Sequence, residues 1–316
     1  MKVFAGSSNP GLAAEIAEHL GQPLGKCEIV KFTNENIKVR ILENARGKDV
    51  FVIQTAAPPV NENLMELLIF IDALKHASAD RITAVLPYYP YARSDKKDEP
   101  RISITARLVA DLLQTAGANR VLTMNLHSPQ IMGFFRIPVD QLLATDLFAQ
   151  HFKKADLSNA VVVAPDAGSA KRADMYAFAL RTPLAILDKR RYADNDQAEV
   201  LHIIGDVEGK RALIFDDEIA TGGSVIEAAE ALFARGVVEV SVGAVHGVLC
   251  GNAAARIKAS SIKEVVVSNT LPVSKEKRDG KIKVLSVANL FADAIVRIHD
   301  GESVSALFRG EAKEKR

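Results

Sequence analysis

Two adjacent carboxylates, Asp216 and Asp217, stand between an apolar stretch and a turn of small residues. The stretch before them, Ala212–Phe215, is predicted to be a short buried strand, and the turn after them spans Thr221–Ser224. Val225–Ala234 follows with apolar residues at helical spacing. Backbone N–H groups in a glycine turn and at a helix N-terminus bind phosphate, and paired carboxylates can accept hydrogen bonds from vicinal sugar hydroxyls. The stretch therefore predicts a site for a ribose 5-phosphate.

A purely structural interpretation of the same stretch is an acidic N-cap followed by a glycine turn, which α/β proteins commonly place between a strand and a helix. We favour the phosphate site because the stretch lies at the C-terminal edge of a predicted strand. Open α/β sheets bind their ligands at that edge.

A second predicted strand, Ala160–Ala164, also ends in a loop suited to an anion. The loop offers backbone N–H groups, a glycine for close approach and two cations that lead into a helix. Its carboxylate, Asp166, could bind a metal directly or through water. The structural alternative is an acidic helix cap followed by two solvated cations. The residues of this loop are Asp166, Ala167, Gly168, Ser169, Ala170, Lys171 and Arg172.

Two further cations, Lys189 and Arg191, follow the next predicted strand, Leu184–Leu187. On its own, a short basic run is more often a solvated surface than a catalytic group. Its place beside two anion loops reverses that preference, because phosphoryl-type transfer needs fixed positive charge where negative charge builds on the leaving oxygens. We therefore expect Lys189 and Arg191 to supply that charge from a mobile loop.

His127 directly follows the predicted strand Val121–Asn125 and could bind a metal or a phosphate there. Earlier in the chain, Arg93 and Arg101 flank the charged run Asp95–Asp98. This segment could be an exposed linker. Its entry through tyrosines and prolines, together with the two arginines, instead favours a lid that closes over a nucleotide.

Apolar runs of strand length alternate with amphipathic segments along the whole chain, which predicts parallel sheets with helices on both faces. Two such series predict two α/β domains, residues 1–143 and 144–316, and the last predicted helix, Val287–His299, could pack back on the first domain. The predicted strands are Met1–Ala5, Cys27–Phe32, Ile37–Leu42, Val50–Gln54, Ile82–Leu86, Val121–Asn125, Ala160–Ala164, Leu184–Leu187, Val200–Ile204, Arg211–Phe215, Val237–Val245 and Val265–Val267.

Composition limits the class of protein. A chain of 316 residues is long enough for two cores, and its net charge of +1 gives no general affinity for nucleic acid or membranes. Cys27 and Cys250 have no metal or redox spacing, so a reduced, cytoplasmic setting is expected. The N-terminus lacks the apolar run of a signal peptide, and no apolar run is long enough to span a membrane.

Taken together, the motifs resemble ribose-phosphate diphosphokinases, also called phosphoribosyl pyrophosphate synthetases, from about Phe4 to Phe308. The resemblance implies two tandem type I phosphoribosyltransferase-like domains. It also implies transfer of the diphosphoryl group of MgATP to the C1 hydroxyl of ribose 5-phosphate, which gives phosphoribosyl pyrophosphate and AMP for nucleotide biosynthesis. The matching stretches are Phe4–Ser8, Asn63–Leu68, Pro90–Asp98, Asn125–Phe135, Pro165–Arg172, Phe215–Ser224 and Gly301–Ser305.

The resemblance also implies roles for individual residues. The loop Asp166–Arg172 would cradle the pyrophosphate, Lys189 and Arg191 would stabilise the transition state, and His127 and Asp166 would serve Mg²⁺. The ribose 5-phosphate site would comprise Asp216, Asp217, Thr221, Gly222, Gly223 and Ser224. The ATP site would comprise Phe32, Asn34, Asn36, Arg93, Ser94, Asp98, Arg101 and His127, with the first three reaching the ATP of a neighbouring subunit.

The family typically assembles as a hexamer of dimers, so self-association into a homohexamer is expected here. A regulatory site for activating inorganic phosphate would comprise Arg46, Ser78, Ser303, Val304 and Ser305. Two other functions remain compatible with the central loop: a phosphoribosyltransferase, which uses the product instead of making it, and a catalytically silent regulatory subunit that binds nucleotide. The arginine-containing segment, His127 and the cations Lys189 and Arg191 favour the synthetase.

Overall fold

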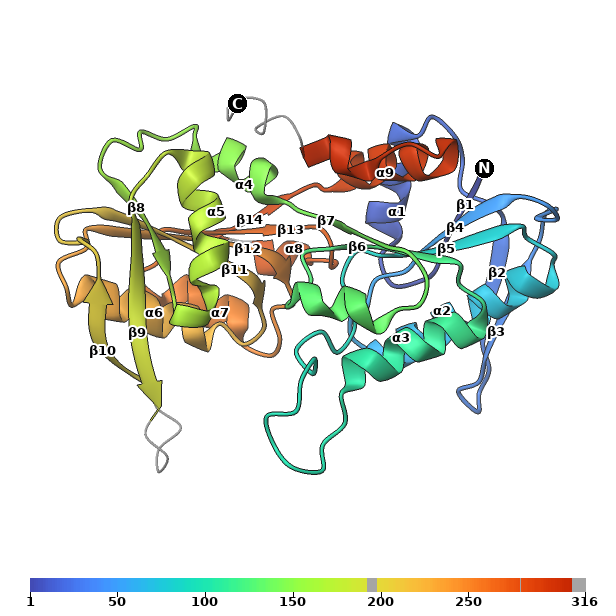
Figure 1. Cartoon of the computed structure of the whole chain (residues 1–316), viewed down its shortest axis with the longest axis horizontal. Helices are drawn as coiled ribbons and strands as arrows, with labels where there is room; N and C mark the ends of the chain where they lie inside the picture. Colours follow the sequence, from blue (N-terminus) through green and yellow to red (C-terminus); the bar gives the residue numbers. More distant parts are fainter. Residues whose placement is uncertain (192–197, 279, 309–316) are drawn as a thin grey trace. The chain divides into compact units, whose positions relative to one another are not determined.

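The structure is a computed structural model that describes residues 1–191, 198–278 and 280–308 (Figure 1). Its contacts divide the chain into two compact units. Among the described residues, the first unit contains 1–143, 270–272 and 286–308, and the second contains those of 144–269 and 273–285. The C-terminal helix therefore belongs to the first unit.

The first unit is built on a five-stranded sheet in which all neighbouring strands are parallel. Helices α1 and α9 pack together on one face of this sheet, and α2 and α3 pack together on the other (Figure 1). The strands in spatial order are β1 (Lys2–Ala5), β4 (Asp49–Ile53), β5 (Arg81–Leu86), β6 (Arg120–Met124) and β7 (Val139–Leu142). The helical segments are α1 (Pro10–His19), α2 (Val60–His76), α3 (Thr105–Ala116), η1 (Pro129–Phe134), α9 (Ala288–Asp300) and η3 (Val304–Phe308).

A separate antiparallel hairpin in the first unit joins β2 (Cys27–Lys31) to β3 (Ile37–Ile41). β3 alternates between half-buried and exposed residues and contacts α2, whereas β2 is half-buried except at Lys31. The loop between them is closed by a hydrogen bond from Phe32 N to Asn36 O, 2.9 Å long. This agrees with the two predicted strands and the polar segment between them.

The second unit contains a seven-stranded sheet that is parallel except at one edge, where β9 and β10 are antiparallel. Its strands in spatial order are β10 (Ala198–Ile204), β9 (Leu184–Arg191), β8 (Ala160–Ala164), β11 (Arg211–Ile219), β12 (Glu239–Gly247), β13 (Glu264–Ser268) and β14 (Ile282–Leu285). The helical segments are α4 (Thr145–Phe152), η2 (Ala167–Ser169), α5 (Ala170–Leu180), α6 (Gly223–Phe233), α7 (Ala253–Ala259) and α8 (Lys275–Arg278).

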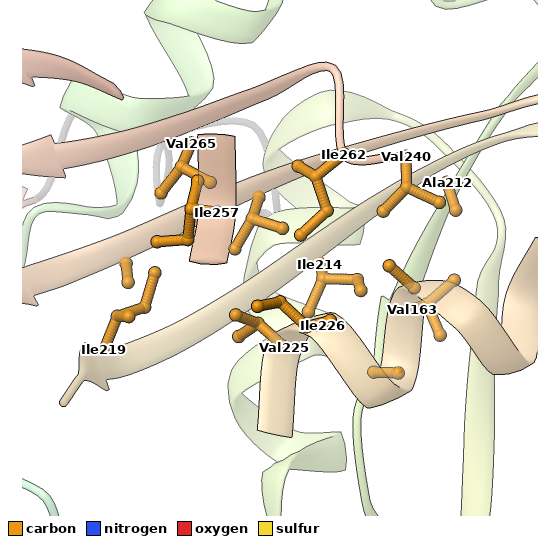
Figure 2. Close-up of a cluster of buried hydrophobic side chains, with 14 of the residues drawn as sticks. Val163, Ala212, Ile214, Ile219, Val225, Ile226, Val240, Ile257, Ile262 and Val265 are labelled. Carbon is orange, nitrogen blue, oxygen red and sulfur yellow. The ribbon is translucent and has the colours of Figure 1, made fainter. Parts of the chain in front are cut away.

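Apolar side chains fill both faces of this sheet. On one face, Ile214 of β11 packs among side chains of the neighbouring strands together with Val225 of α6 and Ile257 of α7 (Figure 2). On the other face, the ring of Tyr176 in α5 stacks on Phe215 with the ring centroids 3.9 Å apart. Continuous apolar strands such as Ala160–Ala164 are typical of parallel sheets covered on both faces.

The predicted α/β class, with mainly parallel sheets flanked by helices, is confirmed. β7, β14 and α7 were not predicted, because each is short and its polar residues or alanines obscure the apolar periodicity. Within the described residues, none of the helices has both the length and the apolarity needed to cross a membrane.

Candidate active site

The acidic pair lies inside strand β11, which corrects the prediction that it follows the strand. β11 continues to Ile219 because it pairs with β12 along its length, with Asp216 opposite Ala244. Its pairing with β8 covers only Arg211 to Ile214. Backbone pairing, which does not depend on apolar side chains, extends the strand past the apolar run. Asp216 and Asp217 therefore project from a rigid element just beyond the end of β8.

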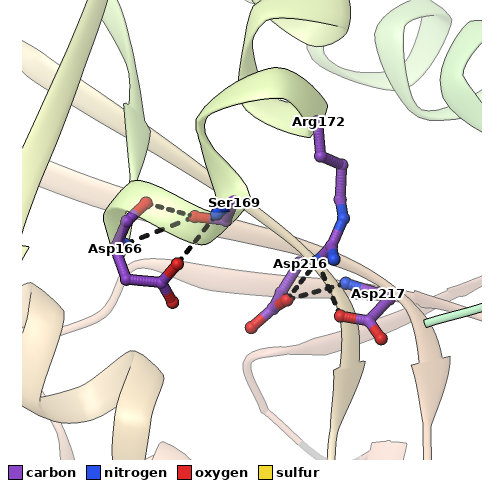
Figure 3. Close-up of polar contacts among 5 residues, drawn as sticks. All are labelled: Asp166, Ser169, Arg172, Asp216 and Asp217. Atoms are coloured by element: carbon purple, nitrogen blue, oxygen red, sulfur yellow. Dashed lines mark hydrogen bonds and ion pairs between the residues drawn. The ribbon is translucent and has the colours of Figure 1, made fainter. Parts of the chain in front are cut away.

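The same two carboxylates bind the guanidinium of Arg172, on the first turn of α5 (Figure 3). Nη1 of Arg172 lies 2.5 Å from Oδ1 of Asp216 and 2.6 Å from Oδ1 of Asp217. The backbone N–H of Asp217 also donates to Oδ1 of Asp216 at 2.9 Å. Two predicted sites, the acidic pair and the loop that contains Arg172, thus form one cluster in the structure, and Arg172 is not a solvated cation.

Burial controls the ionisation of this cluster. It raises the pKa of Asp216 to about 7, aided by the hydrogen bond and the charge of Asp217, and the attraction of Arg172 only partly offsets these effects. Burial alone would lower the pKa of Arg172, but the two carboxylates outweigh it and raise that pKa. The guanidinium is therefore a permanent cation beside a carboxyl group that titrates near neutral pH.

The loop after β8 contains the acidic helix cap that the structural alternative predicted. It also has exposed residues that could contact an anion. Oδ1 of Asp166 accepts from the backbone N–H of Ser169 at 2.8 Å, and Oγ of Ser169 accepts from the backbone N–H of Asp166 at 3.3 Å (Figure 3). These bonds form a capping box at the start of η2. Asp166, Ala167 and Gly168 are exposed, as is Lys171 on the next helix, so this part of the loop is accessible to an anion.

The glycine turn after β11 has the conformation that its sequence requires. Gly222 caps α6 with φ of 76°, in the left-handed region that favours glycine, and α6 begins at Gly223. The segment that follows β12 holds the residue before this turn, because Cys250 N donates to Ala220 O at 2.8 Å. The N–H groups at the start of α6 can therefore converge on a phosphate.

One side chain beside this turn was not identified from the sequence. Nη1 of Arg256, on α7, donates to the backbone oxygen of Thr221 at 3.2 Å. Because α7 was not predicted, nothing in the sequence connected Arg256 with a turn about 35 residues earlier in the chain.

Lys189 and Arg191 belong to β9, which corrects the prediction that they follow the strand on a mobile loop. The strand extends beyond its apolar run because its backbone pairs with β10, with Lys189 opposite Val200 and Arg191 opposite Ala198. Their side chains lie outside the described part of the structure.

In the first unit, the residues predicted to contact adenine lie at the tip of the β2–β3 hairpin. Phe32 is 48% exposed, which is unusual for a large apolar side chain, and Asn34 and Asn36 are exposed as well. The Asn34 side chain accepts from Asn36 N at 3.2 Å and so shapes the turn. An exposed aromatic ring at a hairpin tip is suited to stacking against a planar ligand.

The predicted nucleotide lid is an irregular segment between β5 and α3, with Arg93, Asp98 and Arg101 all exposed. Ser94 anchors it: its hydroxyl accepts from Thr105 N at 3.3 Å and donates to Ser103 O at 3.2 Å. The Ser94 side chain therefore holds the segment to the start of α3.

His127 is exposed shortly after the end of β6, where the sequence predicted it. Among the described residues, no group of three or more His, Cys, Asp or Glu side chains is arranged to hold a metal ion. An exposed carboxylate such as Asp166 nevertheless suits Mg²⁺, which proteins often bind through one or two carboxylates and the phosphates of a substrate.

The residues predicted to bind regulatory phosphate lie on three segments of the first unit. The Arg46 and Ser78 turns are joined by a hydrogen bond from Gly47 N to Ser78 O, 2.8 Å long. The third segment follows α9 and contains Ser303, whose backbone oxygen accepts from Arg297 at 3.5 Å.

Comparison with known proteins identifies the family. The model of the N-terminal domain of ribose phosphate pyrophosphokinase matches residues 1–117, and that of the phosphoribosyl synthetase-associated domain matches residues 194–309. The ribose-phosphate pyrophosphokinase of Caldanaerobacter subterraneus subsp. tengcongensis is 56% identical over 309 residues, with 98% of each chain covered. That of Deinococcus radiodurans is 53% identical over 311 residues, with 97% of each chain covered.

Comparison with solved structures identifies the same family. The crystal structure of phosphoribosylpyrophosphate synthetase from Mycobacterium smegmatis superposes with a TM-score of 0.90 at 42% identity, covering 95% of this chain and 99% of that one. The match includes both units and is not limited to the sheet with the glycine turn. The chain therefore belongs to the ribose-phosphate pyrophosphokinase family, as its motifs predicted.

Proposed function

We propose that the chain transfers the diphosphoryl group of ATP to the C1 hydroxyl of ribose 5-phosphate. The C1 oxygen attacks the β-phosphorus of ATP and loses its proton. The bond from the β-phosphorus to the oxygen that bridges it to the α-phosphorus breaks, and that oxygen leaves with AMP. The other product is phosphoribosyl pyrophosphate, a precursor for nucleotide biosynthesis.

The observation that supports this function best is the cluster of Asp216, Asp217 and Arg172 beside the glycine turn of β11 and α6 (Figure 3). A ribose 5-phosphate has vicinal hydroxyls for the carboxylates and a phosphate for the turn. We assign the hydroxyls to Asp216 and Asp217 and the phosphate to Thr221–Ser224. The loop Asp166–Arg172 then binds the diphosphoryl group that is transferred.

The remaining roles follow the family resemblance. Lys189 and Arg191 stabilise the charge that develops on the transferred group, and the exposed residues of the hairpin and of the segment Arg93–Arg101 bind ATP. His127 and Asp166 serve Mg²⁺, which when bound neutralises charge on the phosphate oxygens. We further propose a homohexamer built from dimers, activation by inorganic phosphate at Arg46, Ser78 and Ser303–Ser305, and a cytoplasmic location.

The test is to incubate the purified protein with ATP, Mg²⁺ and ribose 5-phosphate, and to resolve AMP from ADP. AMP that forms only in the presence of the sugar supports the proposal, and adding inorganic phosphate tests the regulatory site. ADP would indicate transfer of a single phosphoryl group and would contradict the mechanism. The absence of any nucleotide product would favour a silent regulatory subunit or a phosphoribosyltransferase.

A further inference from the structure

We infer that Arg256 supplies the positive charge of the 5-phosphate pocket, an inference that rests on the proposed function. The turn Thr221–Ser224 offers only hydroxyl and backbone donors. A phosphate monoester carries close to two negative charges at neutral pH, and the carboxylates of Asp216 and Asp217 lie in the same strand–turn–helix segment. A cation beside the turn would offset this repulsion.

Helix α7 holds Arg256 against the turn. The buried side chains of Ala253 and Ile257, one helical turn apart, pack near Gly222: a Cβ built on Gly222 would lie 3.6 Å from Ile257 and 3.9 Å from Ala253. Arg256 lies on the exposed side of the same helix. Its hydrogen bond to Thr221 O uses one of the five N–H donors of a guanidinium.

The space around Gly223 indicates where this guanidinium lies. A Cβ built on Gly223 would be 3.7 Å from Oγ1 of Thr221 and 3.8 Å from both terminal nitrogens of Arg256. The hydroxyl proposed to bind phosphate and the cation therefore border the same side of Gly223. Because Gly223 has no positive φ and its built Cβ meets no atom closer than 3.7 Å, the fold does not require glycine there. A glycine at this position keeps the space between the hydroxyl and the guanidinium open for a ligand.

Variants of Arg256 separate its charge from its structural bond to Thr221. Arg256→Lys keeps a cationic donor, Arg256→Gln keeps a neutral donor, and Arg256→Ala keeps neither. If charge binds the phosphate, the Gln and Ala variants should raise the KM for ribose 5-phosphate on the order of tenfold or more, with little change in the KM for ATP. The Lys variant should retain part of the affinity. Arg235→Gln is the matched control, because Arg235 is an exposed arginine near the opposite end of α6.

A second variant tests the pocket without touching the cation. Gly223→Ala should leave the thermal midpoint unchanged and raise the KM for ribose 5-phosphate, because its methyl group fills the space beside Thr221 and Arg256. Calorimetric titration should show that Arg256→Gln weakens binding of ribose 5-phosphate but not of ribose, a selectivity that a merely structural role would not produce.

The inference is wrong if Arg256→Gln keeps the KM for ribose 5-phosphate within twofold of the wild type, or if it weakens the binding of ribose and ribose 5-phosphate equally. A wild-type protein that forms no AMP would contradict the proposed function instead. In that case, titration of the wild type and Arg256→Gln with ribose 5-phosphate still decides the role of Arg256.

Discussion

Nη1 of Arg172 lies 2.6 Å from Oδ1 of Asp217, a carboxylate whose residue is only 4% exposed. Asp216 shares the same guanidinium nitrogen, so a single cation pairs with two carboxyl groups that adjoin each other in one strand. Buried carboxylates of this kind are costly without a partner. Arg172 therefore stabilises the strand that carries the proposed sugar site, in addition to any contact with a substrate.

Replacing Arg172 with alanine should destabilise the protein by about 3 kcal/mol, because it leaves the buried Asp217 and the half-buried Asp216 without their cation. The measurement is thermal or urea unfolding of the variant beside the wild type. Lys171→Ala is the control, since it removes a positive charge from the adjacent, exposed position and should change stability by no more than about 0.5 kcal/mol. Equal effects of the two substitutions would show that the pairing contributes nothing specific.

Asp216→Asn should change the dependence of stability on pH. The folded-state pKa of Asp216, about 7, lies above the unfolded value near 4, so the folded state binds the extra proton between these values. In this window the Asp216 contribution to stability falls as pH rises. The variant lacks this titrating carboxyl group, so its stability relative to that of the wild type should increase from pH 5 to pH 8. Thermal midpoints measured at both pH values, with the exposed Asp174→Asn as the control, check the sign.

Gly222→Ala should strain the phosphate turn, because residue 222 has φ of 76° and an L-residue pays roughly 1–2 kcal/mol in the left-handed region. The substitution should lower the thermal midpoint, whereas Gly209→Ala, at a similar φ of 68° in the loop before β11, measures the generic cost of such a change. Gly222→Ala should also raise the KM for ribose 5-phosphate, while Gly209→Ala should leave that KM unaltered. A turn that tolerates alanine at 222 with full activity would argue against its role in binding phosphate.

Asp49→Asn should loosen the contact of α9 with the rest of the first unit. Asp49 accepts from Nε of Arg81 at 2.8 Å and from Nδ1 of His299 at 2.7 Å, and Arg81 also donates to Ile298 O at 2.8 Å. Burial alone would raise the pKa of Asp49, but the hydrogen bonds and charges of Arg81 and His299 outweigh it and lower the pKa. The wild-type advantage should be about 2 kcal/mol at pH 7.

The sign of this effect follows from the lowered pKa. The stabilisation is fully present above the unfolded pKa of about 4 and is lost as pH falls through the folded value. Unfolding at pH 7 and below pH 4 should therefore show a large difference between wild type and variant at the first pH and a small one at the second. Asp293→Asn, an exposed carboxylate on α9, should show neither effect.

The sequence was most informative where one strand and the loop that follows it contain all the residues of a predicted site. The order of Asp216, Asp217 and the glycine turn was sufficient to predict a strand, a phosphate turn and a helix. The ends of β9 and β11 could not be predicted, because they depend on backbone pairing with β10 and β12 and not on apolar residues.

Contacts between side chains of separate helices and strands also could not be predicted from the sequence. Arg172 was identified as part of an anion loop, but its bonds to Asp216 and Asp217 depend on how α5 packs beside β11. Nothing in the sequence indicated a role for Arg256, because its contact with the turn depends on the position of α7. Pairings of this kind require the three-dimensional structure.

Diphosphoryl transfer is tested most directly by a ³¹P NMR spectrum of the protein with ATP, Mg²⁺ and ribose 5-phosphate. We expect the ATP signals to be replaced, in equal amounts, by those of AMP and of a diphosphate attached to C1 of the sugar. Formation of ADP with a sugar monophosphate ester at C1, or of AMP with only free pyrophosphate, would contradict diphosphoryl transfer to ribose 5-phosphate.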